Sequence, residues 1–263
     1  MTNSIKQVTD NNEQISLFEV APWDDEKRGL PNDYARSALF TVRNKRVSRL
    51  ALQNQPIYST NKSVSISYTG VELRAEDDEL VWQQVLQFAK RTTPGDVVEF
   101  TFYELCKELG WSVNGAYYKK AEDCLSRLQA SAVRFTSTRL GMLESISFLD
   151  GFKVVNRGDK KKCRCQIKIS KDIITLFSGS HYSRISWQQY RRLSPIARRL
   201  YDYFSTHKEP FPLKIENFKL VCSSNVKELK KWREMTKKAC KELEESKLVK
   251  FVWVENDLIK CIR

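Results

Sequence analysis

Glycine, proline and histidine are scarce in this sequence, and no long apolar run occurs. Only 9 Gly and 7 Pro stand among 263 residues, while 41% of the residues are hydrophobic and 11% are aromatic. Such a composition excludes a chain that is disordered throughout, and at this length it predicts a folded protein of two domains. No run reaches the roughly 18 apolar residues that span a bilayer, so we expect no membrane segment.

The two histidines and the missing glycine-rich motif argue against two classes of enzyme. His181 and His207 lie far apart and form no His-x-His pair, so the metal site of a rolling-circle nicking enzyme cannot be assembled in the usual way. No glycine-rich run ends in Gly-Lys-Ser or Gly-Lys-Thr, which excludes a phosphate-binding loop for ATP. We therefore expect no enzyme activity, no catalytic residues and no cofactor.

Seven cysteines are present, an odd number, in a chain with no apolar leader at its start. This pattern predicts a reducing, cytoplasmic compartment rather than a disulfide framework. Cys163 and Cys165 form a single Cys-x-Cys without a second pair, so we expect no bound metal. Four other cysteines sit among apolar neighbours at helical spacing and are expected in the core, namely Cys106, Cys124, Cys222 and Cys240.

Negative charge is in short supply. The 45 Lys and Arg residues outnumber 32 Asp and Glu residues, which gives a net charge of +13. Residues 33–185 hold 24 basic and 16 acidic side chains, residues 186–263 hold 18 and 10, and residues 1–32 are acidic overall. Two basic regions suit two surfaces that face a polyanion such as the DNA backbone. Basicity that only keeps the chain soluble, or that serves a ribosomal setting, is the alternative.

The hydrophobic pattern predicts an α+β protein with a flexible tail over 1–32 and two domains over 33–185 and 186–263. In the first domain the pattern predicts a strand at 64–68, a helix from Asp77 or Asp78 to Ala89, and a strand at 97–102. A short helix over 101–109, a turn at 112–115 and a longer helix through Ala130 have helix-turn-helix spacing. Alternating segments then predict a β-hairpin wing with a basic tip, and they cover 132–136, 143–148, 152–155 and 163–169.

The last 78 residues repeat this arrangement. A helix is expected from 194 to 207, a short strand at 211–213, a helix at 215–222, a turn at 223–225, and a long helix from 226 to 246. A hairpin over 248–254 and 258–262 completes the unit. Helix, strand, helix, turn, helix and hairpin is the winged-helix order, so the chain is predicted to hold two winged-helix domains in tandem.

The long helix of the second domain separates its apolar and basic residues. Leu229, Trp232, Thr236, Ala239, Cys240 and Leu243 fall on one stripe, which we expect to face the core. The opposite side is the face that a recognition helix lays into the major groove. A solvated basic face is the alternative. The predicted DNA-binding residues on this side are Lys227, Lys230, Lys231, Lys237, Lys238 and Lys241, with Arg233 flanking them.

The corresponding helix of the first domain carries less charge, because Glu122 and Asp123 intervene. Asn114 and Arg127 are candidates to read base edges, while Lys119 and Lys120 suit phosphate contacts. The alternative is that this helix forms a dimer or domain interface. The wing tip adds Arg157, Lys160, Lys161 and Lys162 as basic residues.

The acidic tail contains a short apolar island, Gln14-Ile15-Ser16-Leu17-Phe18. This segment resembles the pentapeptide by which bacterial proteins bind the replicative sliding clamp. In that motif Leu17 and Phe18 would fill apolar pockets and Gln14 would hydrogen-bond at the rim, and a flexible tail suits folding upon binding. The alternative is that the island staples the tail onto the first domain.

Over most of its length, from about residue 14 onward, the sequence resembles the TrfA family of plasmid replication initiators. The resemblance rests on 14–18, on Pro31-Asn32-Asp33 with 35–40, on Tyr68-Thr69-Gly70-Val71-Glu72-Leu73-Arg74, on 78–86, on 100–106, and on Lys230-Lys231-Trp232-Arg233-Glu234. It implies binding to iteron repeats at a plasmid origin, opening of an adjacent AT-rich region, with single-stranded DNA as a further ligand, and a link to plasmid copy control. It also implies recruitment of the host helicase, initiator and sliding clamp, and a monomer in equilibrium with a homodimer.

Two departures from the family limit what can be carried over. The resemblance leads us to expect that the longer amino-terminal extension of some members is missing here, and Ala116 stands where a larger polar residue is expected. A transcriptional repressor or partition protein with the same two domains is the alternative function.

Overall fold

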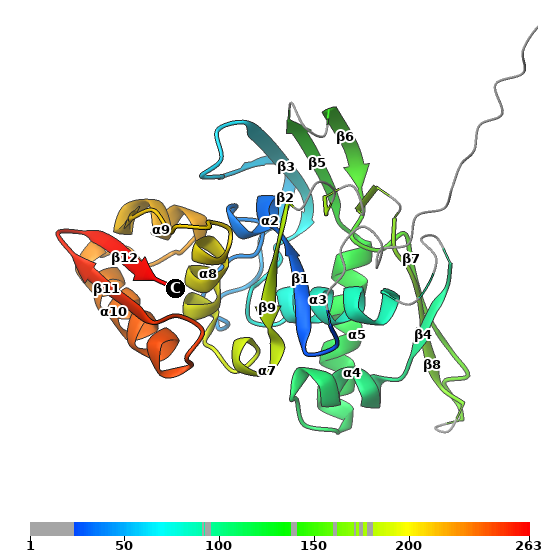
Figure 1. Cartoon of the computed structure of the whole chain (residues 1–263). Helices are drawn as coiled ribbons and strands as arrows, with labels where there is room; N and C mark the ends of the chain where they lie inside the picture. The colour runs from blue at the N-terminus through cyan, green and yellow to red at the C-terminus, as the bar shows by residue number, and fades with distance from the viewer. Residues whose placement is uncertain are drawn as a thin grey trace, which may run out of the picture.

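The computed structural model describes residues 24–90, 92, 96–137, 141–159, 162–170, 172–173, 176–177 and 181–263. Figure 1 shows a mixed α/β molecule in which the C-terminal unit, coloured yellow to red, lies beside the rest of the chain. Two three-stranded sheets lie at opposite ends of the molecule in this view. Buried apolar side chains form one continuous cluster that runs through both parts.

The first unit follows the predicted order of elements. Its sheet has the strand order β4-β8-β7, with antiparallel pairs throughout. The elements are α3 (Asp78–Ala89), β4 (Val98–Phe100), α4 (Phe102–Leu109), α5 (Gly115–Gln129), β7 (Gly151–Val155) and β8 (Arg164–Lys168).

The second unit repeats the same order with its own sheet, β10-β12-β11. In both sheets the first strand pairs with the last one, and the last one pairs with the middle one. The elements are α8 (Pro195–Ser205), β10 (Leu213–Lys214), α9 (Ile215–Val221), α10 (Leu229–Glu245), β11 (Phe251–Glu255) and β12 (Leu258–Ile262). The helix expected from 226 begins at Leu229, because Glu228 keeps an extended backbone. Lys227 therefore precedes the helix.

Local signals explain where the helices of the first unit begin and end. Thr101 and Glu104 form a capping box at the start of α4, with reciprocal bonds between each side chain and the other backbone N–H. Gly110 ends this helix with φ +70°, a left-handed conformation that suits glycine. The Asn114 side chain then caps α5 by accepting from the Tyr117 N–H at 3.1 Å.

The predicted wing of the first unit is corrected by the structure. Of its four strands, only β7 and β8 form the hairpin, whereas β5 (Ala132–Ser137) and β6 (Gly141–Ile146) join β2 (Ala51–Ile57) and β3 (Val64–Val71) in a separate sheet. The reason is packing, because the buried Ile66 of β3 lies opposite the buried Phe135 of β5.

The predicted flexible tail is also too long. Lys27–Pro31 forms strand β1, which pairs with β9 (Tyr182–Ser186). Leu30 is buried, and the Arg28 guanidinium donates to Gln84 at 2.8 Å. Two short helices follow these strands, α2 (Asn32–Ala35) and α7 (Trp187–Tyr190).

A buried ionic cluster joins the two units. Arg199 of α8 donates to Glu79 of α3 and to Asp202, each at 2.9 Å, and all three side chains are fully buried. Although burial lowers the pKa of Arg199, attraction to Glu79 and Asp202 raises it above its ordinary value. Arg199 also donates to backbone carbonyls around α2, so the cluster fixes the second unit against the first.

Candidate nucleic-acid interface

Helix α10 is held in place from its inner side. Trp232 is fully buried, packs against the ring of Phe218 of α9 and donates from its indole nitrogen to the Ile215 carbonyl at 3.2 Å. Near the other end of the helix, Glu242 accepts from the Ser194 hydroxyl at 2.6 Å, and Glu244 accepts from the Val252 N–H at 2.8 Å. These contacts tie α10 to α8, α9 and β11, so the outer face is carried by a rigid element.

The outer face of α10 is basic and open to solvent, as the sequence predicts. Trp232, Thr236, Ala239, Cys240 and Leu243 are buried on the inner side. Lys230, Lys238 and Lys241 project from the opposite side, with Lys231 and Lys237 at its edges. Five of the predicted cations here are exposed and make no ion pair with any residue that the structure describes, namely Lys227, Lys230, Lys231, Lys237 and Lys238.

Two of the predicted cations on α10 have partners among the described residues. Arg233 binds Asp257 of the hairpin turn with two bonds of 2.6 and 2.8 Å, so it braces the hairpin against α10. The Lys241 ammonium lies 3.8 Å from a carboxylate oxygen of Glu245, and this exposed ion pair contributes little to the stability of the fold. The turn itself is tight, because Asn256 and Asp257 both take positive φ angles, and it presents no basic tip.

The sequence interpretation missed Glu234. At about 100° per residue this side chain falls in the middle of the lysine face, and it is exposed. It makes no ion pair with the neighbouring lysines in the described structure. A helical projection of the sequence alone could have found it. A carboxylate in this position can accept a hydrogen bond from a cytosine amino group in the major groove.

On the matching face of α5, neighbouring side chains already contact both lysines. Lys119 lies 2.9 Å from Asp123. Lys120 sits over the ring of Trp111, 4.4 Å from its centroid. The Asn114 oxygen caps the helix. An asparagine that binds adenine with two hydrogen bonds uses this oxygen together with the amide nitrogen, so the cap competes with such binding.

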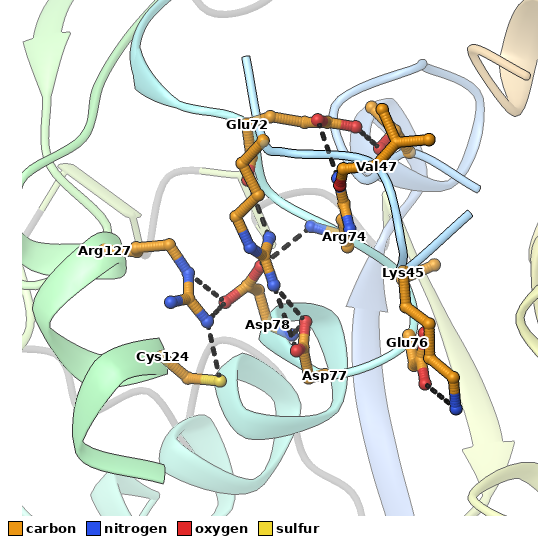
Figure 2. A network of polar contacts seen from close by, with 12 residues as sticks. Lys45, Val47, Glu72, Arg74, Glu76, Asp77, Asp78, Cys124 and Arg127 are labelled. Carbon is orange, nitrogen blue, oxygen red and sulfur yellow. Dashed lines mark hydrogen bonds and ion pairs between the residues drawn. The ribbon is translucent and has the colours of Figure 1, made fainter. Parts of the chain in front are cut away.

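The prediction that Arg127 points outward to read a base is wrong. Its guanidinium turns toward the protein and binds the buried Asp78 carboxylate at 2.9 and 3.0 Å, as Figure 2 shows. Arg49 binds the same carboxylate at 2.6 Å and the neighbouring Asp77 at 2.8 Å. Burial and the nearby Asp77 raise the pKa of Asp78 despite both arginines. Arg127 therefore supports the structure.

Asp77, Asp78 and Cys124 place three possible metal ligands within 4.8 Å of one another. Guanidinium groups already neutralise both carboxylates there. Burial raises the pKa of the Cys124 thiol well above its ordinary value, which disfavours the thiolate that a metal needs. This donor set suits arginine better than a metal ion.

The remaining predicted residues lie on the wing and the tail. Arg157 reaches from the β7–β8 hairpin to Glu122 of α5 at 2.6 Å, so it ties the wing to the helix. Lys162 is exposed and lies 4.0 Å from Asp159. Lys160, Lys161, Gln14, Leu17 and Phe18 lie outside the described residues.

Comparison with known proteins identifies the family. The sequence profile of the TrfA protein matches residues 2–263. This chain belongs to the TrfA family. The curated TrfA relative named plasmid replication initiator protein TrfA, from Escherichia coli, is 60% identical over 250 residues, which cover 95% of this chain and 65% of the relative. The chain thus spans just under two thirds of that relative's length.

Two solved structures share the fold at low sequence identity. A crystal structure of selenomethionine derivatives of domains 2 and 3 of RctB matches with a TM-score of 0.56 and 10% identity, covering 81% of this TrfA-family chain and 86% of the other. A second structure of RctB domains 2–3 gives a TM-score of 0.52 and 9% identity, with 77% and 81% covered. Within the described residues, no helix combines the length and apolar character needed to cross a membrane.

Proposed function

We propose that this chain is a plasmid replication initiator. In this account its two units are winged helices that bind iteron repeats at an origin and promote opening of an adjacent AT-rich region. The proposal is supported by membership of the TrfA family and by the name of the 60% identical relative. The repeated order of elements in the two units supports the winged-helix assignment.

The observation that carries the DNA-binding proposal is the outer face of α10. Five exposed lysines on and just before this helix lack ion-pair partners among the described residues, and the helix is fixed from within by Trp232. Free lysines on a rigid helix can replace the counterions that condense on DNA. The face of α5 is compensated, so we propose that α10 supplies the larger share of the electrostatic attraction.

Footprinting on a plasmid origin that carries tandem repeats tests this function. An initiator protects the repeats and makes thymines of the neighbouring AT-rich segment reactive to permanganate. Protection of a promoter without that reactivity would favour the repressor or partition alternative. Absence of any protection would contradict DNA binding by this chain.

We also propose that Gln14, Leu17 and Phe18 bind the sliding clamp, and that helicase and initiator recruitment and a monomer–dimer equilibrium belong to the same function. Leu17→Ala with Phe18→Ala should abolish capture of purified clamp and leave origin binding unchanged, because the change removes only the two apolar anchors. Ile5→Ala, outside the pentapeptide in the same tail, serves as the control. Loss of both clamp capture and origin binding in the double variant would show that the segment is structural.

A further inference from the structure

A short basic loop connects α2 to β2 beside the junction of the two units. We call residues 42–48 the bridging loop. It carries Arg43, Lys45 and Arg46 in four consecutive positions. Lys45 and Arg46 are exposed, and the Lys45 side chain retains 75% of its accessible surface.

The bridging loop is held in a defined shape by hydrogen bonds. Asn44 closes a turn by accepting from the N–H groups of Arg46 and Val47, at 2.9 and 3.0 Å. Arg74 donates to the Val47 carbonyl at 2.8 Å, and Figure 2 shows its side chain beside Val47. Beyond the loop, Arg49 is anchored on Asp77 and Asp78. The backbone of the loop therefore has a defined shape, from which the Lys45 and Arg46 side chains project into solvent.

The bridging loop lies between contacts that hold α5 and contacts that hold the turn before α10. Just beyond the loop, Arg49 shares the Asp78 carboxylate with Arg127 of α5. On the other side, the Val42 N–H donates to the carbonyl of Cys222 at 2.7 Å, immediately after α9 and before the turn into α10. A groove of about 640 Å³ follows this junction and is lined by Arg43 together with Ser223, Ser224 and Asn225 of that turn. The bridging loop thus lies between the two units, on the side of the turn that joins α9 to α10.

The cations of the loop are weakly compensated. Arg43 has its Nε 3.7 Å from Glu72, and Lys45 has its ammonium 3.9 Å from Glu76. These distances are long for ion pairs, and the second pair is exposed, so solvent screens it. Arg46 forms no ion pair within the described residues. Lys45 and Arg46 are therefore available to an external anion, whereas the Arg43 side chain is largely buried beside Glu72.

We propose that the bridging loop binds backbone phosphates of the duplex between the segments that face α5 and α10. This inference rests on the proposed DNA binding. The loop lies between the contacts that hold α5 and the turn before α10, so we place it against the stretch of a shared duplex between these two helices, where phosphate charges are closely spaced. Contacts of this kind fix the register of a protein on DNA without reading its sequence.

The test uses the full chain and a duplex enriched by it from a random-sequence pool, with hydroxyl-radical footprints locating the two protected segments. Lys45→Ala with Arg46→Ala should lower the salt dependence of the binding constant, the slope of log K against log salt, by about 2, because each bound phosphate contributes roughly 0.9. Lys62→Ala with Lys208→Ala removes two exposed charges elsewhere and should leave the slope unchanged.

Neutral methylphosphonates placed one at a time along the duplex locate the contact. Those between the two protected segments should weaken binding of the wild-type chain and leave the loop variant unaffected. Equal penalties for both proteins, or an unchanged slope in the loop variant, would overturn the inference. The variant Lys230→Ala, Lys231→Ala and Lys237→Ala separates the two claims. If it loses slope while the loop variant does not, only the loop proposal fails, and if neither loses slope, DNA binding through α10 fails as well.

Discussion

A glutamate in the middle of a lysine face gives α10 a group that can discriminate between bases. Lysines that contact phosphate strengthen binding to every sequence, whereas a carboxylate accepts a hydrogen bond from cytosine and repels phosphate. Glu234 stands among Lys230, Lys231, Lys237 and Lys238 without pairing with any of them in the described structure. Its position makes it the first candidate for direct readout.

Glu234→Gln should therefore relax the preference for one base pair, with a loss of about 1–3 kcal/mol of discrimination there. Binding to duplexes altered at each position in turn measures this. Glu245→Gln, exposed on the same side but beside Lys241, is the control and should leave the base profile unchanged. If Glu234→Gln raised the affinity for all sequences equally and kept the base preference of the wild type, Glu234 would act only by repelling phosphate and not by reading a base.

Helical spacing was sufficient to predict the buried and exposed sides of α10, because both depend on residues three or four positions apart. The same reasoning failed for Arg127. Its partner Asp78 lies 49 positions earlier in the chain, and the guanidinium reaches it only after α3 and α5 have packed. Arg49 shares that carboxylate for the same reason. Residues that bind through long-range pairs of this kind cannot be assigned from a local pattern.

At the scale of the element, the turn between α4 and α5 depends on one glycine. Gly110 has φ +70°, and an added Cβ would lie 2.6 Å from the Arg191 guanidinium. Gly115 begins α5, and an added Cβ there would meet nothing within 4 Å. Substitution by alanine should therefore be unfavourable at Gly110 and tolerated at Gly115.

Gly110→Ala should lower the free energy of unfolding by about 1–2 kcal/mol, because alanine is strained at positive φ. Gly115→Ala should leave it unchanged or raise it by up to about 1 kcal/mol, since alanine favours the helix. Urea unfolding of the two variants measures both effects. Equal effects would contradict the left-handed helix end.

Helices and strands were easier to predict from the sequence than the neighbours with which the strands pair. The helix starts predicted at 101, after the turn at 112–115 and at 194 are confirmed within a residue, and in the structure Thr101, Asn114 and Ser194 cap these helices. Alternation predicted strands β5 and β6 but not the sheet that they join. A strand pattern gives the face that is buried and leaves the neighbouring strand unspecified, and β2 and β3 lie far earlier in the chain.

At the scale of the whole molecule, the buried cluster of Arg199, Glu79 and Asp202 keeps the two units in a fixed relation. Removing one partner of a buried ion pair is costly, because the remaining charge is left uncompensated. Burial, together with repulsion from Glu79, raises the pKa of Asp202 well above its ordinary value. A group with a raised pKa in the folded state stabilises the fold at low pH and loses that contribution as pH rises.

Glu79→Gln should therefore lower the free energy of unfolding by about 3 kcal/mol at neutral pH. Asp202→Asn should cost about 1 kcal/mol or less, because the amide oxygen still accepts from Arg199. It should also flatten the fall in stability with rising pH above about 4, the ordinary range of an aspartate. Urea titrations of both variants across pH check this. A pH profile of Asp202→Asn identical to that of the wild type would contradict the assignment.

DNA binding by the lysine face of α10 is the central claim, and the salt dependence of affinity tests it most directly. For the variant Lys230→Ala, Lys231→Ala and Lys237→Ala, the slope of log K against log salt should fall by about 0.9 for each phosphate that the variant no longer binds. The double variant Lys62→Ala with Lys208→Ala should keep the wild-type slope. An unchanged slope in the α10 variant, with its fold intact by thermal unfolding, would contradict the account.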